Sequence, residues 1–121
     1  MAQSRQPFGQ RGEQLAARYL QARGYIIVAT NWRCRSGEID IVAQQADLLV
    51  FVEVRTRHAA LPETAFESIS ERKRARLVRA VHVYLAQHRL DDMGWRMDVI
   101  AIAVPPNGEP ILEHRQDAFD W

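Results

Sequence analysis

The sequence GEIDIVAQQADLLVFVEVRTR, residues 37–57, decides the fold of this chain. Two runs rich in Val, Ile and Leu flank the turn-forming residues 45–47, so the stretch predicts two antiparallel strands joined by a tight turn. Carboxylates interrupt both runs, at Asp40 in the first and at Glu53 in the second. Acidic residues are depleted in strands, so their place in this hairpin needs a physical reason.

The spacing predicts that Asp40 and Glu53 face each other. Side chains alternate across a strand, and a turn centred on residues 46–47 sets these two residues opposite each other, with Cβ atoms roughly 4.5–5.5 Å apart. A slip by two residues would bring Glu38 opposite Glu53 instead, whereas an odd slip would turn the apolar residues outward. Facing like charges destabilise a sheet, so the pair calls for Arg55 or a bound metal. Hard oxygen ligands suit Mg²⁺ or Mn²⁺.

Two interpretations of these charges are open. In the structural one, Glu53 pairs with Arg55 or Arg57 on a solvated sheet face and Asp40 ends a strand. In the functional one, the carboxylates hold a metal and a nearby cation stabilises charge on a scissile phosphate. Glu13 adds weight to the second, because helical spacing aligns it with an apolar stripe, although an exposed first-turn position would also suit it. The combination favours a phosphodiester-cleaving site.

Helices are predicted on both sides of this hairpin. Apolar periodicity predicts one over residues 11–24, with Gly24 as its C-terminal cap. A longer amphipathic helix is predicted over residues 67–89, with Ser68 and Glu71 forming a capping box.

Further strands complete the pattern. Residues 25–32 and 96–104 are β-rich, and residues 109–114 form a possible short edge strand. The element order is αβββαβ with a possible final strand, which predicts an α/β fold with a mixed sheet flanked by helices.

The composition indicates one globular domain. The chain has 121 residues, of which 47% are hydrophobic and 26% charged, so it can bury a core without staples. We expect residues 1–9 to form a flexible tail, residues 10–121 the domain, and the last seven residues within it a short C-terminal tail. No export signal or membrane segment is recognisable, which makes the cytoplasm the expected location.

A basic run lies within the second predicted helix. Five cations fall within eight residues, a density suited to phosphate contacts, while the net charge is only +1. A solvated helix face, a membrane surface and a protein partner remain alternatives. The candidate nucleic-acid contacts are Arg55, Arg57, Arg72, Lys73 and Arg76.

Other cofactor chemistries lack support in the sequence. The four histidines show no paired zinc-ligand spacing, and Cys34 has no nearby partner. No glycine-rich loop predicts a nucleotide, so we expect no organic cofactor.

The quoted hairpin, preceded by GEQLAARYL and followed by RMDVIAIAV, resembles the bacterial YraN-like family. That family is related to the Holliday-junction resolvases of the PD-(D/E)XK nuclease superfamily, and the likeness runs from Gly12 to the final EHRQDAF. The resemblance implies a restriction-endonuclease-like core. It also implies that Asp40 and Glu53 bind metal, that the Val54 carbonyl adds a ligand, and that Glu13 supports the site from the first helix.

Arg55 departs from the superfamily pattern, whose E-x-K motif has lysine at this position. Arginine stays protonated and cannot act as a base, but it can still clamp a phosphate. The expected function is therefore a metal-dependent endonuclease acting on DNA rather than RNA, with branched or flapped structures as substrates. A catalytically inactive nucleic-acid-binding module and a protein-interaction adaptor are the alternatives. A homodimer is expected by analogy with resolvases, which cut two strands symmetrically.

Overall fold

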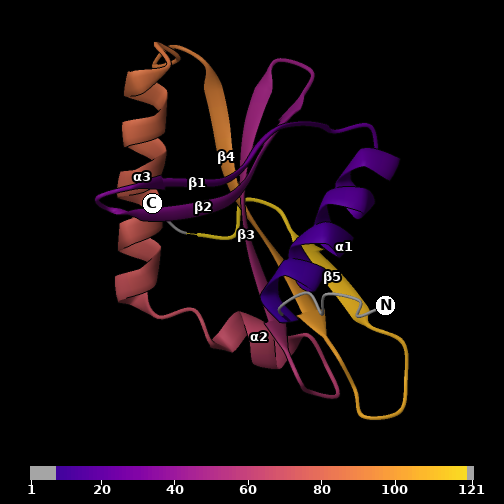
Figure 1. Cartoon of the computed structure of the whole chain (residues 1–121). Helices are drawn as coiled ribbons and strands as arrows, with labels where there is room; N and C mark the ends of the chain where they lie inside the picture. The colour runs from indigo at the N-terminus through magenta and orange to yellow at the C-terminus, as the bar shows by residue number, and fades with distance from the viewer. Residues whose placement is uncertain (1–7, 120–121) are drawn as a thin grey trace, which may run out of the picture.

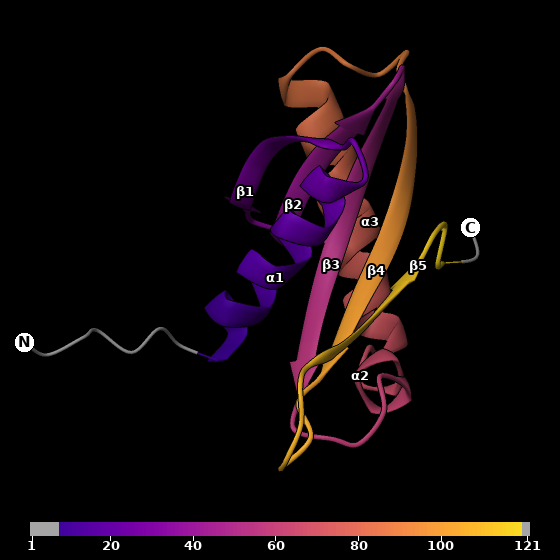
Figure 2. The same ribbon diagram turned by 90° about the vertical axis from the view of Figure 1, so that its right-hand side faces the viewer.

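A five-stranded mixed sheet divides the molecule, with α1 on one face and α3 on the other (Figures 1 and 2). The computed structural model describes residues 8–119. The strand order is β1-β2-β3-β4-β5, with β3 and β4 parallel and the other neighbours antiparallel. The predicted α/β fold is confirmed. The elements are α1 (Phe8–Ala22), β1 (Ile26–Cys34), β2 (Gly37–Gln45), β3 (Leu48–Arg57), α2 (Glu63–Glu67), α3 (Glu71–Gln87), β4 (Gly94–Ala103) and β5 (Ile111–Arg115).

Both faces of the central strands β3 and β4 are buried. Phe51, Met97 and Leu77 belong to the core between the sheet and α3, whereas Leu20 and Ile100 belong to the core between the sheet and α1. Burial on both faces explains why β3 and β4 are almost continuously apolar rather than alternating. A polar side chain in the middle of either strand is therefore costly unless it has partners. Within residues 8–119, no helix is long and apolar enough to cross a bilayer.

The β2–β3 hairpin has the predicted register. Ile41 pairs with Val52, and the ladder continues to Gln45 and Leu48 on either side of the turn. The regular pairing stops at Ile41 and Val52, one residue short of Asp40 and Glu53. Figure 1 shows the far part of β2 turning away from β3 together with β1. The opening between the two strands is therefore lined by the two predicted acids.

Two predicted helix starts are corrected. The helix α1 begins at Phe8, inside the segment expected to be a tail, while residues 1–7 lie outside the described part of the chain. The cap of α3 is Ser70, whose Oγ accepts a hydrogen bond from the Lys73 amide at 3.1 Å. The predicted capping box at Ser68 is wrong, because Ser68 ends the unpredicted helix α2 and donates to the Ala65 carbonyl at 2.6 Å. A helix of five residues is too short to show a helical period in sequence.

The C-terminal segment is also more ordered than expected. Phe119 is buried, and the Ala118 amide donates to the Met97 carbonyl at 2.9 Å. The expectation of a free tail after β5 is therefore wrong for these residues. One aromatic and one backbone hydrogen bond are too little pattern to predict such docking from sequence.

Candidate active site

Asp40 lies at the point where β2 leaves β3. Its carboxylate Oδ2 accepts a hydrogen bond from the Val54 amide at 2.8 Å. Asp40 is 9% exposed and Glu53 only 2%. The side chain of Asp40 thus takes the place of a backbone acceptor in the opening hairpin, which satisfies one buried donor of β3. The two acids are brought together as the sequence predicted.

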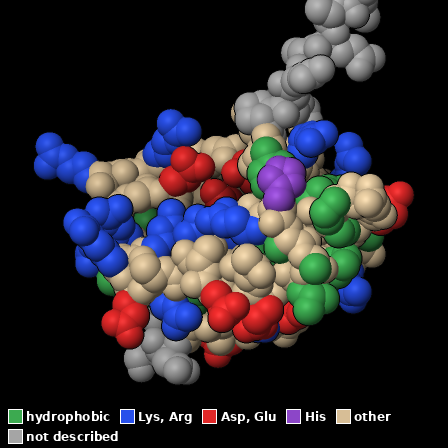
Figure 3. Space-filling model, turned by 90° about the horizontal axis from the view of Figure 1, so that it is seen from below, with side chains coloured by type: hydrophobic (Ala, Val, Ile, Leu, Met, Phe, Trp, Pro, Cys, Tyr) green, Lys and Arg blue, Asp and Glu red, His purple; other side chains and the backbone are tan. Residues whose placement is uncertain are grey.

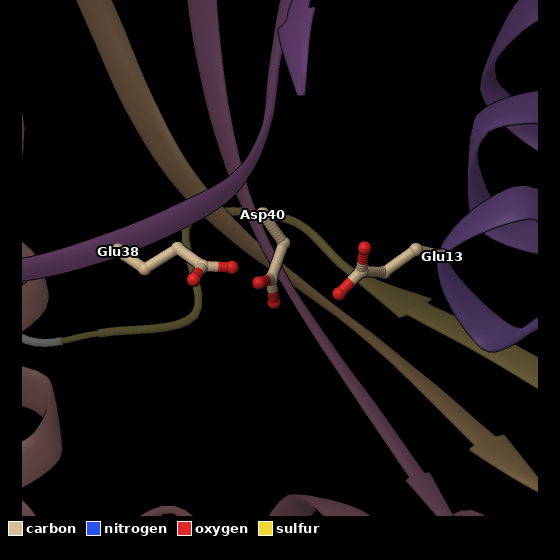
Figure 4. Close-up of side chains that lie close together, drawn as sticks. All are labelled: Glu13, Glu38 and Asp40. Carbon is tan, nitrogen blue, oxygen red and sulfur yellow. The ribbon is translucent and has the colours of Figure 1, made fainter. Parts of the chain in front are cut away.

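Glu13 reaches the same place from α1, and Gly12 makes this approach feasible. A Cβ atom added to Gly12 would lie 1.9 Å from Thr56 Oγ1 of β3. Only glycine therefore lets α1 lie so close to β3 without displacing Thr56. Carboxylate oxygens of Glu13, Glu38 and Asp40 all lie within 4.8 Å of one another. Figure 4 shows Asp40 between the other two carboxylates, which point toward it.

Glu38 and Asn31 are site residues that the sequence analysis did not assign. Asn31 Nδ2 donates to Glu13 Oε1 at 2.8 Å and to Glu38 Oε2 at 3.2 Å, so one amide bridges two carboxylates. Asn31 adopts a left-handed backbone conformation with φ 52°, which asparagine tolerates better than most residues. Arg33 Nε also pairs with Glu38 at 2.9 Å. The available signal for Glu38 was its i, i+2 spacing from Asp40, which places both on one strand face.

Asp40 and Glu13 resist ionisation. Burial, followed by the charge of Glu53 and a hydrogen bond with it, raises the pKa of Asp40 to about 8, against the opposing effect of the Val54 amide. Burial also raises the pKa of Glu13, with Asp40 and Glu38 adding to it and the Asn31 hydrogen bond opposing it. Carboxylates this close do not all ionise unless a cation joins them.

Two cations from different elements approach Glu53. Arg55 Nε lies 3.6 Å from Glu53 Oε2, too long for a hydrogen bond, and Arg55 Nη2 donates to the Ser68 carbonyl at 3.3 Å. Lys73 Nζ, from the first turn of α3, lies 3.8 Å from the same Glu53 oxygen. Arg57 Nη1 instead donates to the backbone carbonyl of the preceding residue at 2.8 Å. Lys73, predicted as a nucleic-acid contact, therefore lies beside Glu53.

The remaining predicted contacts lie on the surface. Arg72 and Arg76 are exposed side chains of α3. Figure 3 shows a band of basic side chains beside acidic ones on the lower end of the molecule, where α2 and the start of α3 lie. A cavity of about 230 Å³ between α1 and β1 is lined by Glu13 and Asn31, among others. Glu13 and Asn31 are thus reachable from solvent.

The donor set fits a hard divalent cation. Carboxylate oxygens come from α1, β2 and β3, and all are hard ligands of the kind that Mg²⁺ and Mn²⁺ prefer. The ligand set implied by the resemblance is Glu13, Asp40, Glu53 and the Val54 carbonyl, and Glu38 lies close enough to join it. The raised pKa of Asp40 fits the same chemistry, because a bound cation would stabilise the charged form that burial disfavours.

A mixed α/β sheet with acids gathered where a central hairpin opens is a restriction-endonuclease-like arrangement. Residues 12–102 match the model of "Uncharacterised protein family UPF0102", and the chain belongs to this family. It is 47% identical over 116 residues to a UPF0102 protein of Roseiflexus castenholzii, covering 94% of either chain. It is 43% identical over 120 residues to one of Herpetosiphon aurantiacus, covering 96% of either chain. The resemblance to the YraN-like family is confirmed.

Proposed function

We propose that this protein is a Mg²⁺- or Mn²⁺-dependent endonuclease that hydrolyses phosphodiester bonds of DNA. The observation that carries the proposal is the gathering of acids from three separate elements at one opening of the sheet. Carboxylate oxygens of Glu13, Glu38 and Asp40 lie within 4.8 Å of one another, and Glu53 is hydrogen-bonded to Asp40. Gathering like charges in a partly buried site costs stability. Functional sites are where proteins accept such a cost.

The residues divide the work of hydrolysis between them. Asp40, Glu53 and Glu13, with the Val54 carbonyl, would hold the ion, which would supply Lewis acidity for activating water and stabilising charge on the phosphate. Asp40 would have to be ionised to hold it, and Arg55 and Lys73 place positive charge near Glu53. Arg57, together with the exposed cations of α3, draws the DNA backbone toward the opening.

Branched or flapped DNA is the proposed substrate, on the strength of the likeness to resolvases. Backbone contacts carry no sequence information, which suits a protein that recognises DNA structure rather than sequence. Cutting two strands symmetrically would require two copies of the site, so we propose a homodimer as the working unit on four-way DNA.

A cleavage assay on single-stranded, duplex, flapped and four-way DNA tests the proposal. It is run with Mg²⁺, Mn²⁺ or chelator on the wild type, Asp40→Ala and Glu53→Ala, with Arg89→Gln as a control that removes an exposed charge at the far end of α3. Product that needs metal, vanishes in both acid variants and persists in the control supports the nuclease. Cleavage that survives either acid variant in a clean preparation defeats the assignment.

The same assay separates the second candidate, a binding module without turnover, which Arg55 in place of the motif lysine favours. Salt-sensitive DNA binding without metal-dependent product would indicate the module. Absence of DNA affinity at low salt would indicate the protein-interaction adaptor.

A further inference from the structure

Arg55 is already engaged by the protein itself. Its side chain is 22% exposed, and its Nη2 atom donates to the Ser68 carbonyl. Its Nε atom is buried 3.6 Å from Glu53 Oε2, without a hydrogen-bond partner. Ser68 ends α2 just before α3 begins. Arg55 therefore ties the site strand to the α2–α3 connection, and reaching a substrate would break that tie.

Lys73 is more exposed than Arg55 and is held less tightly by the protein. Its side chain is 33% exposed, and its ammonium lies 3.8 Å from Glu53 Oε2, near enough for an ion pair. An ammonium has three donor hydrogens on a flexible stem, so facing Glu53 leaves others directed toward solvent. The Ser70 cap fixes the first turn of α3, which determines where this stem begins. Lys73 is thus a positioned cation with free donor capacity beside the carboxylates.

We propose that Lys73, and not Arg55, is the cation that contacts the DNA phosphate at the carboxylate cluster. The inference rests on the proposed function and gives Lys73 and Arg55 different roles in it. Arg55 is a positioning residue that holds β3 against the α2–α3 connection. The sequence motif points to position 55 because it is two residues after Glu53, but the fold brings residue 73 to the same carboxylate from across the domain.

One property of the chain makes this assignment testable without relying on cleavage alone. Lys73 is the only lysine in the sequence. Expression with lysine labelled with ¹³C at Cε therefore labels the side chain of Lys73 alone and leaves the three donor hydrogens of its ammonium in place. The Cε signal then reports on Lys73.

The experiment combines rates and spectra. Single-turnover cleavage of flapped DNA with Mg²⁺ is measured for the wild type, Lys73→Met, Lys73→Arg and Arg55→Met, with Arg89→Gln as the control, and thermal melting gives the folded fraction of each variant. We expect Lys73→Met to lower the rate about 100-fold or more, the usual effect of losing one preorganised contact to developing charge. Lys73→Arg should recover most of that loss. Arg55→Met should lower the melting temperature, with a rate loss at least about tenfold smaller than that of Lys73→Met once the folded fraction is taken into account.

The Cε signal of Lys73 should move on saturation with the same DNA in Ca²⁺, relative to its position in Ca²⁺ alone. The inference is overturned if Lys73→Met cleaves within about threefold of the wild type, or if the Lys73 signal does not move. A folded Arg55→Met that loses as much rate as Lys73→Met would also overturn it. If the wild type cuts nothing, the nuclease proposal fails, and the Cε signal still decides whether Lys73 contacts DNA.

Discussion

Two clusters built around a buried aspartate lie in the same sheet, and they are constructed in opposite ways. Asp98 on β4 is fully buried and accepts hydrogen bonds from Arg96 at 2.7 and 2.9 Å and from the Asp117 amide at 3.0 Å. His114 Nε2 lies 2.8 Å from Asp98 Oδ2. Asp40 has one backbone donor and is surrounded mainly by other acids.

The pKa values of the two aspartates follow this difference. Burial alone would raise the pKa of Asp98, but hydrogen bonds from His114, Arg96 and the Asp117 amide outweigh it and lower the pKa. Burial and the charge of Glu53 raise the pKa of Asp40 to about 8. The first cluster compensates the charge of its aspartate, whereas Asp40 has no ion pair among residues 8–119, and the cations of its cluster pair with Glu38 and Glu53. Buried charge is therefore a sign of function here only where its partners are missing.

We call the acids around Asp40 the open cluster and the network around Asp98 the closed cluster. The largest expected effect comes from neutralising acids of the open cluster. Asp40→Asn and Glu53→Gln should each lower cleavage about a thousandfold or more, because metal-held charge stabilisation is worth several kcal/mol. Asp40→Asn should nevertheless melt at the same temperature as the metal-free wild type at pH 8, or higher, because it removes a repulsive charge. Cleavage assays and melting curves with chelator measure both. A loss of several degrees in the Asp40→Asn variant would show that Asp40 is a structural residue.

The matching change in the closed cluster should lower the stability of the fold. Asp98→Ala leaves the half-buried Arg96 without its carboxylate partner and should lower the free energy of unfolding by about 3–5 kcal/mol. Urea denaturation measures it, and Asp98→Asn, which keeps the shape and one acceptor, should lose less. If Asp98→Ala cost under about 1 kcal/mol, the view that this network compensates its own charge would be wrong.

The sequence predicted the open cluster better than the closed one. The turn at residues 46–47 and the apolar pattern fix the register, and that register alone brings Asp40 and Glu53 together. Nothing comparable links Asp98 to His114, because β4 and β5 are joined by an irregular connection that leaves their pairing undetermined in sequence. Residues that meet through a tight hairpin are predictable, whereas residues that meet through loops are not.

The same reason explains the site residues that were missed or placed elsewhere. Asn31 reaches Glu13 because β1 shifts its register against β2 between Ile27 and Ala29, and because Asn31 itself is left-handed. Lys73 reaches Glu53 because α2 intervenes before α3 begins. A bulge and a one-turn helix leave almost no periodic signal in the sequence, yet they determine where Asn31 and Lys73 lie.

The pH dependence of stability sharpens the contrast between the clusters. Asp40 has a pKa of about 8 in the folded protein against an ordinary value of 3.8, so the folded state holds a proton that the unfolded state has lost between these values. Its contribution to stability is fully present below the ordinary value and is lost as the pH rises through the folded value. With chelator, the wild type should therefore lose melting temperature relative to Asp40→Asn over this range. Mg²⁺ should reduce that loss, since the cation takes the place of the proton.

The smallest expected effect comes from the amide that holds two acids of the open cluster together. Asn31→Ala removes both hydrogen bonds to Glu13 and Glu38 and should weaken Mg²⁺ binding about tenfold, the lower range for loss of a residue that orients metal ligands. Calorimetric titration of Mg²⁺ measures this effect. Asn31→Gly is the matched variant, because it also lacks the amide but relieves the left-handed backbone.

If both variants bind Mg²⁺ equally weakly, the lost amide is responsible. If Asn31→Gly binds like the wild type, then the backbone of β1 positions Glu13 and Glu38, and the amide does not. Unchanged affinity in both variants would mean that the metal is held by Asp40 and Glu53 alone, with the outer acids serving the charge balance of the opening rather than ion binding. Only Asp40 and Glu53 would then be metal ligands, and the contrast with the Asp98 network would rest on these two acids.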